Sequence, residues 1–215
     1  MKSIAIVTDS NCGMSPAQAN ELGVYMLPMP FFIDDKEYLE DIDMNQAQFF
    51  QHLEQNPSCR VSTSQPTPES VTTLWDKLLK DYDEIVHIPM SSGLSSSMQT
   101  AHMLAEDYDG HVRVVNNQRI SGTLRYSAIE AIQQAKNTMT KAIKDDIANR
   151  FGEKINLDVI HSHNLEAAEE FRKEVLTSFP SIGEVNIFPL SLSVSCHIGP
   201  GSLALTCSKV HPEIW

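Results

Sequence analysis

The chain has no excess of positive charge. It contains 16 Lys and Arg residues against 28 Asp and Glu residues, which gives a net charge of -12 over 215 residues. The basic residues are dispersed along the sequence instead of being clustered. Because a protein that binds phosphate backbones needs clustered Lys and Arg, this composition argues against a nucleic-acid-binding groove.

Cysteine is scarce, and long apolar runs are missing. The cysteines at positions 12, 59, 196 and 207 form no C-x-x-C pair, so neither a zinc site nor a disulfide framework is predicted. No apolar segment reaches the roughly 20 residues that a transmembrane helix needs. The sequence does not open with a basic segment and an apolar stretch, so we expect no signal peptide. These absences favour a cytoplasmic protein with reduced thiols.

The common enzyme signatures are also missing. The sequence has no G-x-G-x-x-G after a strand, no P-loop, no G-x-S-x-G and no H-E-x-x-H. His161 and His163 could form a metal pair, but no acidic or Cys partner is nearby in the sequence, which favours structural histidines. Cys196 and His197 are adjacent, which is not the usual arrangement of a catalytic thiol and its base. The sequence therefore predicts a protein that is not an enzyme and has no metal or cofactor.

Short apolar runs alternate with helical patterns along the chain. The clearest helix opens at Thr67, where apolar residues from Val71 to Leu79 recur at i, i+3, i+4, i+7 and i+8. Such alternation predicts an α/β fold with a parallel sheet that carries helices on both faces. A helical pattern from Ser121 to about Phe151 is longer than usual for a globular protein. Strands are expected at residues 4–7, 24–27, 84–88, 111–115, 155–160 and 185–190.

A serine-rich loop, PMSSGLSSSMQ at residues 89–99, joins an expected strand to an expected helix. The first N–H groups of a helix lack internal partners, so such a loop can hold a carboxylate or a phosphate. The hydroxyls of Ser92 and Ser95 would add donors, and Gly93 would let the backbone come close to a ligand. The same residues equally suit an ordinary turn with a serine N-cap, and the loop alone leaves both interpretations open.

Two other segments could add donors to such a site. Thr63 and Ser64 open a second hydroxyl cluster, and His197 precedes a tight Gly-Pro-Gly loop. His197 could donate to an anion or could be a structural histidine. Hydroxyl donors without fixed charge suit reversible binding of a carboxylate better than catalysis, because no base, nucleophile relay or metal accompanies them.

Several motifs in a fixed order resemble those of the DegV family of fatty-acid-binding proteins. Any single motif is weak, but their combination over most of the chain is specific. One departure is Glu40, which stands where the family's second motif usually has Asp. The matching segments are IAIVTDS at residues 4–10, YLEDID at 38–43, TSQP at 63–66, SSGLSSSMQ at 91–99 and HIGPG at 197–201.

The resemblance implies a fold of two domains with an acyl chain buried between them. The first would be a doubly wound parallel-sheet α/β domain at residues 1–130, and the second an α/β domain at residues 131–215. The family normally has further strands after the helix that follows the fourth strand. Here residues 128–131 pass directly into residues 134–139, which resemble the sequence after that block. The second domain is therefore expected to be shortened, and the long helical pattern to be two joined helices.

The resemblance also implies a function. The ligand would be a long-chain fatty acid, whose carboxylate Thr63 and Ser92 would hold, with a separate fatty acid kinase as a partner. Two alternatives stay open: an enzyme of phosphoryl or acyl transfer that uses the serine-rich loop, and a shortened family member that binds nothing. The predicted carboxylate site consists of Thr63, Ser64, Ser92, Gly93, Ser95 and His197.

Overall fold

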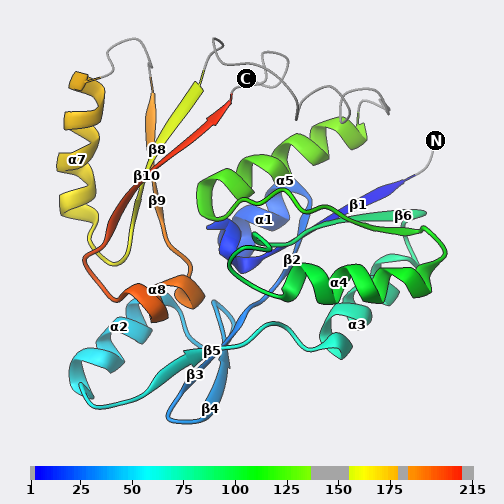
Figure 1. The fold of residues 1–215 in the computed structure, drawn as a ribbon, viewed down its shortest axis with the longest axis horizontal. Coiled ribbons are helices and arrows are strands. Elements are labelled where there is room, and N and C mark those ends of the chain that lie inside the picture. Colours follow the sequence, from blue (N-terminus) through cyan, green and yellow to red (C-terminus); the bar gives the residue numbers. More distant parts are fainter. Residues whose placement is uncertain (1–2, 137–154, 179–183, 210–215) are drawn as a thin grey trace.

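The computed structural model describes residues 3–136, 155–178 and 184–209. Its central sheet has four parallel strands in the order β2-β1-β6-β7, of which Figure 1 labels β1, β2 and β6. Because neighbouring strands are parallel, each connection crosses over the sheet, and β1 pairs with β6 although β2 to β5 lie between them in the chain. This arrangement confirms the predicted α/β class. The strands are β1 (Ile4–Asp9), β2 (Val24–Leu27), β6 (Glu84–Ile88) and β7 (Val112–Val114).

Helices cover both faces of the central sheet because successive side chains of β1 point in opposite directions. Ile6 packs with residues of α1 and α5 on one face. Ala5 and Val7 pack with residues of α3 and α4 on the other face, around the buried Trp75. These helices are α1 (Pro16–Leu22), α3 (Pro68–Leu78), α4 (Ser97–Ala105) and α5 (Ser121–Lys136), and the short 3-10 helices are η1 (Ser10–Cys12) and η2 (Glu106–Tyr108).

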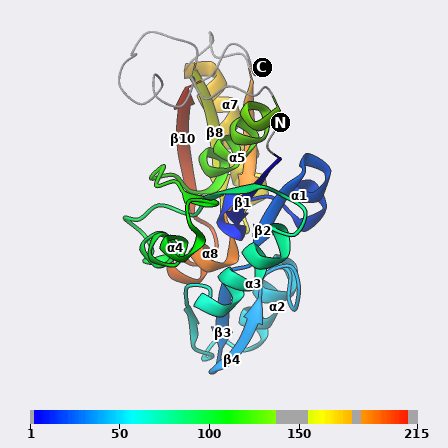
Figure 2. The same cartoon turned by 90° about the vertical axis from the view of Figure 1, so that its right-hand side faces the viewer.

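A small antiparallel sheet, which the apolar pattern does not indicate, lies at one end of the molecule and α7 at the other (Figure 2). Its hairpin turns at Asp34 and Asp35, whose φ angles of 47° and 67° are the left-handed values that a two-residue turn requires. Phe31 and Phe49 anchor the packing of this sheet on α2. The elements are β3 (Pro30–Ile33), β4 (Lys36–Leu39), α2 (Gln46–Gln55) and β5 (Val61–Thr63).

A third sheet follows in the order β10-β8-β9, with α7 packed on one face. Helix α5 contacts both this sheet and the central one, and Figure 1 shows it between them. The Tyr126 hydroxyl of α5 donates to the buried Asp158 Oδ1 at 2.9 Å, and Asn186 donates to the same oxygen. The elements are β8 (Ile155–His161), α7 (Leu165–Ser178), β9 (Val185–Pro189), α8 (Leu192–Ile198) and β10 (Leu203–Lys209).

The expected boundary between domains, at residues 130 and 131, falls within α5. The expected join between two helices, between residues 131 and 134, also falls within α5, which is continuous from Ser121 to Lys136, and the rest of the long helical pattern lies outside the described residues. The division into two domains therefore stays a prediction. Among the helices of the described residues, none is both long and apolar enough to cross a membrane.

Leu124 of α5 is fully buried in the cluster that joins this helix to the central sheet. Leu124→Ala should lower the free energy of unfolding by about 2–5 kcal/mol, because the lost methyl groups leave a cavity. Urea denaturation measures this loss. Leu165→Ala is the control, since Leu165 is 57% exposed and its truncation should cost less than about 0.5 kcal/mol. Equal losses in the two variants would contradict the assigned core.

Candidate functional site

The predicted site residues Thr63 and His197 meet in the folded chain. Thr63 is the last residue of β5, and His197 lies in the last turn of α8. Thr63 Oγ1 and His197 Nε2 are 2.8 Å apart, a hydrogen bond between residues separated by 134 positions. Thr63 is half-buried and His197 is exposed, so a ligand can reach the pair from solvent.

The serine-rich loop folds as a tight turn before α4, which begins at Ser97. The Ser91 carbonyl accepts from the N–H groups of Leu94 and Ser95, at 2.9 and 3.2 Å. Ser95 Oγ accepts from the Ser97 N–H at 3.1 Å and keeps its own hydrogen to donate. Ser92 is half-buried, and within the described part of the chain its hydroxyl forms no hydrogen bond. The loop therefore caps its helix and still presents free hydroxyl donors.

Ser64 and Gly93 each donate a hydrogen bond to a residue of their own segment. The Ser64 hydroxyl donates to the Gln65 carbonyl at 3.1 Å, so its hydrogen is used within its own segment. Gly93 does not have a positive φ, and a Cβ there would only touch Ser91 Oγ at 3.5 Å. Neither the φ angle of Gly93 nor a close neighbour within the chain requires glycine there, and its expected role of letting the backbone approach a ligand stays a prediction.

The TSQP segment and the serine-rich loop lie against each other. Thr100 Oγ1 of α4 donates to Gln65 Oε1 at 3.1 Å. Pro66 and Pro89 share the lining of a small cavity of about 10 Å³ with the buried His87. Burial lowers the pKa of His87 to about 4, so its ring is neutral at physiological pH. The fold thus brings the TSQP segment into contact with His197 through Thr63, and against the two ends of the serine-rich loop through Gln65 and Pro66.

The carboxylate of Asp9 fixes the edge of the sheet where these segments meet. Asp9 is the last residue of β1, and its Oδ2 accepts from the Met90 N–H at 2.7 Å. Its Oδ1 accepts from the Asn11 N–H at 3.0 Å. Burial raises the pKa of Asp9 to about 6 against the opposing effect of these hydrogen bonds. One buried side chain therefore ties the end of β1 to the start of the serine-rich loop.

A second buried polar cluster lies behind the Thr63–His197 pair, and the sequence motifs did not assign it a role. Asn11 Oδ1 accepts hydrogen bonds from Ser191 and Ser193. Glu40 Oε2 accepts from the Ser10 hydroxyl at 2.9 Å, and burial raises the pKa of Glu40 to about 7. The sequence offered one signal for this cluster, the polar turn after β1. Polar turns are common, and this one is unusual because the fold buries it.

In the part of the chain that the structure describes, no positively charged side chain is hydrogen-bonded to the site. Among the described residues, no Lys or Arg side chain forms a hydrogen bond with the TSQP segment, the serine-rich loop or His197. The guanidinium of Arg119 instead donates to Ser127 Oγ at 2.8 Å. The donors available to an anion are therefore hydroxyl groups and an imidazole.

The histidines considered as a metal pair have other contacts. His161 Nδ1 accepts from the Asn164 N–H at 3.1 Å. The His163 ring stacks on Phe50 with a centroid separation of 4.3 Å. Within residues 3–136, 155–178 and 184–209, no group of three or more His, Cys, Asp or Glu residues could hold a metal ion.

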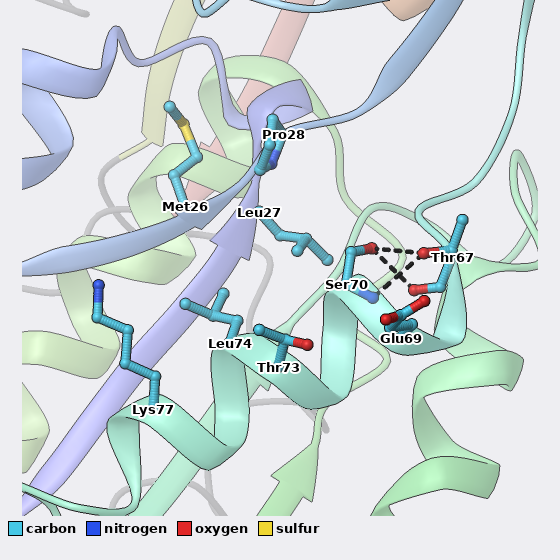
Figure 3. A pocket seen from close by; sticks show the side chains of 9 residues that line it. All are labelled: Met26, Leu27, Pro28, Thr67, Glu69, Ser70, Thr73, Leu74 and Lys77. Carbon is cyan, nitrogen blue, oxygen red and sulfur yellow. Dashed lines mark hydrogen bonds between the residues drawn. The ribbon is translucent and has the colours of Figure 1, made fainter. Parts of the chain in front are cut away.

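An apolar groove of about 410 Å³ lies between α3 and the β2 edge of the central sheet (Figure 3). Met26 and Pro28 form one wall, and Leu74 and Lys77 lie on the other. The hydrogen bonds drawn between Thr67 and Ser70 are the N-terminal cap of α3. None of the predicted site residues lines this groove, so we place the anion site by its hydrogen-bond donors instead.

Replacing Asp9 tests the assigned electrostatics. The folded state binds the Asp9 proton more tightly than the unfolded state, because its pKa is about 6 in the fold and about 3.9 in the unfolded chain. This contribution to the free energy of unfolding is fully present below about pH 3.9 and is lost as the pH rises through about 6. Asp9→Asn removes this dependence. The unfolding free energy of the wild type should therefore fall relative to the variant by on the order of 3 kcal/mol between pH 3.5 and pH 7.5.

Urea titrations at several pH values measure this difference. Asp34→Asn is the matched control, because Asp34 is exposed at the tip of the β3–β4 hairpin. The difference in unfolding free energy between the wild type and Asp34→Asn should vary by less than about 0.5 kcal/mol across the same pH range. If the difference between the wild type and Asp9→Asn were also independent of pH, the raised pKa assigned to the buried Asp9 carboxyl would be contradicted.

Comparisons with known proteins agree with this architecture. Two solved structures of DegV proteins superimpose over nearly the whole chain, with TM-scores of 0.82 for the *Thermus thermophilus* protein and 0.84 for the *Streptococcus agalactiae* protein. They cover 97% and 98% of this chain and 100% of their own, at 18% and 16% identity. Likeness at this level of identity establishes the fold.

Sequence relatives point the same way. A DegV domain-containing protein of *Mycoplasmopsis pulmonis* is 35% identical over 118 residues, which cover 55% of this chain and 40% of the relative. A 15.5 kDa DegV domain-containing protein of *Staphylococcus aureus* is 30% identical over 128 residues, 60% of this chain and 90% of the relative. This chain spans about half the length of most of the curated relatives it matches. The family model described as an uncharacterised protein of the DegV family matches residues 3–142, well over half of the sequence, and the chain therefore belongs to the DegV family.

Proposed function

We propose that this chain binds a long-chain fatty acid and holds its carboxylate at Thr63, Ser92 and His197. The observation that carries the proposal is the 2.8 Å contact between Thr63 Oγ1 and His197 Nε2. The Gln65–Thr100 hydrogen bond links the TSQP segment to the helix that follows this loop. The free Ser92 hydroxyl would then complete the donor set.

The proton on the histidine decides how the pair would act. When Nε2 carries a proton, it donates to Thr63 Oγ1, and the threonine hydrogen is left to donate to a carboxylate. A hydrogen bond to a charged group contributes about 1.5–3 kcal/mol. A few such bonds from groups without fixed charge would favour the head group of an amphiphile over a nucleotide phosphate, which usually also takes a lysine or a metal ion.

The remaining predicted residues would have secondary roles. Ser95 keeps a hydrogen and would be a further donor. The donors of Ser64 and Gly93 are used within their own loops, so we propose that these residues shape the site without contacting the ligand.

The solved relatives support the choice of ligand. The *Thermus thermophilus* and *Streptococcus agalactiae* structures are described as fatty acid binding, and a related protein from *Eubacterium ventriosum* as binding stearic acid. We extend this ligand class to the present chain. We further propose that the bound acid is presented to a separate fatty acid kinase, because the sequence has no nucleotide motif of its own.

Lipid extraction and titration test the proposal. Mass spectrometry of an organic extract of the purified protein should detect a long-chain fatty acid, and delipidated protein should bind added oleate. Thr63→Val keeps the shape of the side chain and removes the hydroxyl. It should weaken oleate binding about 10- to 100-fold, the value of one hydrogen bond to a charged group.

Thr73→Val is the matched control for this titration. Thr73 is exposed on α3 and lines the apolar groove, so its substitution should leave oleate affinity unchanged. A loss with Thr73→Val but not with Thr63→Val would place the ligand in the groove. Absence of both extracted lipid and oleate binding would favour a chain that binds nothing, and esterase or ATPase activity of the isolated chain would favour the transferase.

A further inference from the structure

Helix α8 carries His197 at its C-terminal end, and its first turn is held by side chains from two distant segments. Asn11 Oδ1 of η1 accepts from Ser191 Oγ at 2.6 Å and also from Ser193 Oγ. Glu40, directly after β4, accepts from the Leu192 N–H through Oε1 at 2.6 Å. Asn11 and Glu40 are 0% and 5% exposed, so these contacts are shielded from water.

The position of the first turn of α8 fixes the position of His197, because the helix is short and packs on the core of the small sheet. It has seven residues, a rise of about 10 Å, and its Leu192 and Cys196 pack on the aromatic core of the small sheet. One turn further on, His197 Nε2 meets Thr63 Oγ1. A shift of the first turn would therefore displace the imidazole from the threonine hydroxyl.

Both oxygens of the ionised Glu40 carboxylate act as acceptors. The Ser10 hydroxyl and the Leu192 N–H both donate to it, at 2.9 and 2.6 Å. Ser10 Oγ already accepts from the Met29 N–H at 3.1 Å, so its hydrogen is directed to Glu40. Protonation would remove the charge that strengthens both hydrogen bonds and put an O–H group in place of one acceptor, so the contacts of Glu40 with Ser10 and Leu192 would weaken.

We propose that Asn11 and Glu40 are positioning residues that set His197 against Thr63, and that protonation of Glu40 loosens this arrangement. The effect on affinity rests on the proposed fatty-acid site. The anchoring of α8 itself can be tested without any ligand. The outcome would be a carboxylate site whose geometry depends on pH through a residue that never touches the ligand.

The surroundings of Glu40 favour titration near neutrality. Burial, together with the negative charges of Asp41 and Asp9, raises the pKa of Glu40 to about 7. The other titratable groups facing it are the thiols of Cys12 and Cys196, whose pKa values burial raises to about 12, so both are neutral. Glu40 therefore changes charge between pH 6 and pH 8, above the pKa of Asp9 at about 6, while both thiols stay neutral.

Glu40→Gln tests the proposal, because glutamine resembles the protonated acid and does not titrate. The ratio of the oleate dissociation constants of variant and wild type should be about 10 at pH 8, the value of one hydrogen bond, and should approach 1 at pH 6. Taking the ratio cancels the pH dependence that both proteins share, including that of the ligand. A ratio independent of pH would overturn the role of Glu40.

A matched control and a second variant keep the test decisive. Asp43→Asn changes an exposed carboxylate in the same loop, which accepts from the Leu39 N–H, and should leave the ratio near 1 at every pH. Ser191→Ala removes one donor to Asn11 and should weaken oleate binding several-fold at every pH, because asparagine does not titrate. Unchanged binding by this variant would overturn the role of Asn11.

Hydrogen exchange separates this inference from the proposed function. At pH 8 the Leu192 amide should exchange about tenfold faster in ligand-free Glu40→Gln than in the wild type, and at pH 6 at the same rate. Equal rates at both pH values would overturn the anchoring. If the wild type binds no oleate, the proposed function fails, and the exchange rates still decide whether Glu40 anchors α8.

Discussion

The carboxylate of Asp9 is the interaction on which the arrangement of the site depends. A buried carboxyl group must be hydrogen-bonded, and Asp9 meets this requirement with backbone N–H groups of Met90 and Asn11. The first contact places the start of the serine-rich loop at the end of β1. The second shapes the turn that presents Asn11 to α8. Loops that follow β1 and β6 are thus fixed relative to each other by one side chain.

Helix α5 imposes the next constraint, because it is shared by two sheets. Its apolar residues, such as Leu124, pack on the central sheet, while the Tyr126 hydroxyl reaches the buried Asp158 of the third sheet. The third sheet therefore has a defined place relative to the first. Helix α8, which leaves that sheet after β9, can then reach the small sheet and bring His197 to Thr63.

The character of the site follows from what these constraints leave available. Most backbone N–H groups of the tight turns donate within their own loops. Among the described residues, the Lys and Arg side chains that form hydrogen bonds do so away from the site. What remains is a set of hydroxyl groups with one imidazole. Groups of this kind can stabilise a carboxylate through a few hydrogen bonds without a fixed positive charge. This chemistry suits reversible binding.

The sequence by itself determined the α/β class, because alternating apolar runs and amphipathic helices leave few other ways to bury both faces of a sheet. Its motifs also selected Thr63 and His197, whose contact the fold bears out. It did not indicate the small sheet, since the β3–β4 hairpin turns on Asp34 and Asp35 without a glycine. Nor could it show that Asn11 and Glu40 are buried. Polar residues in turns normally face water, and only the packing of segments up to 182 positions apart removes water from these two.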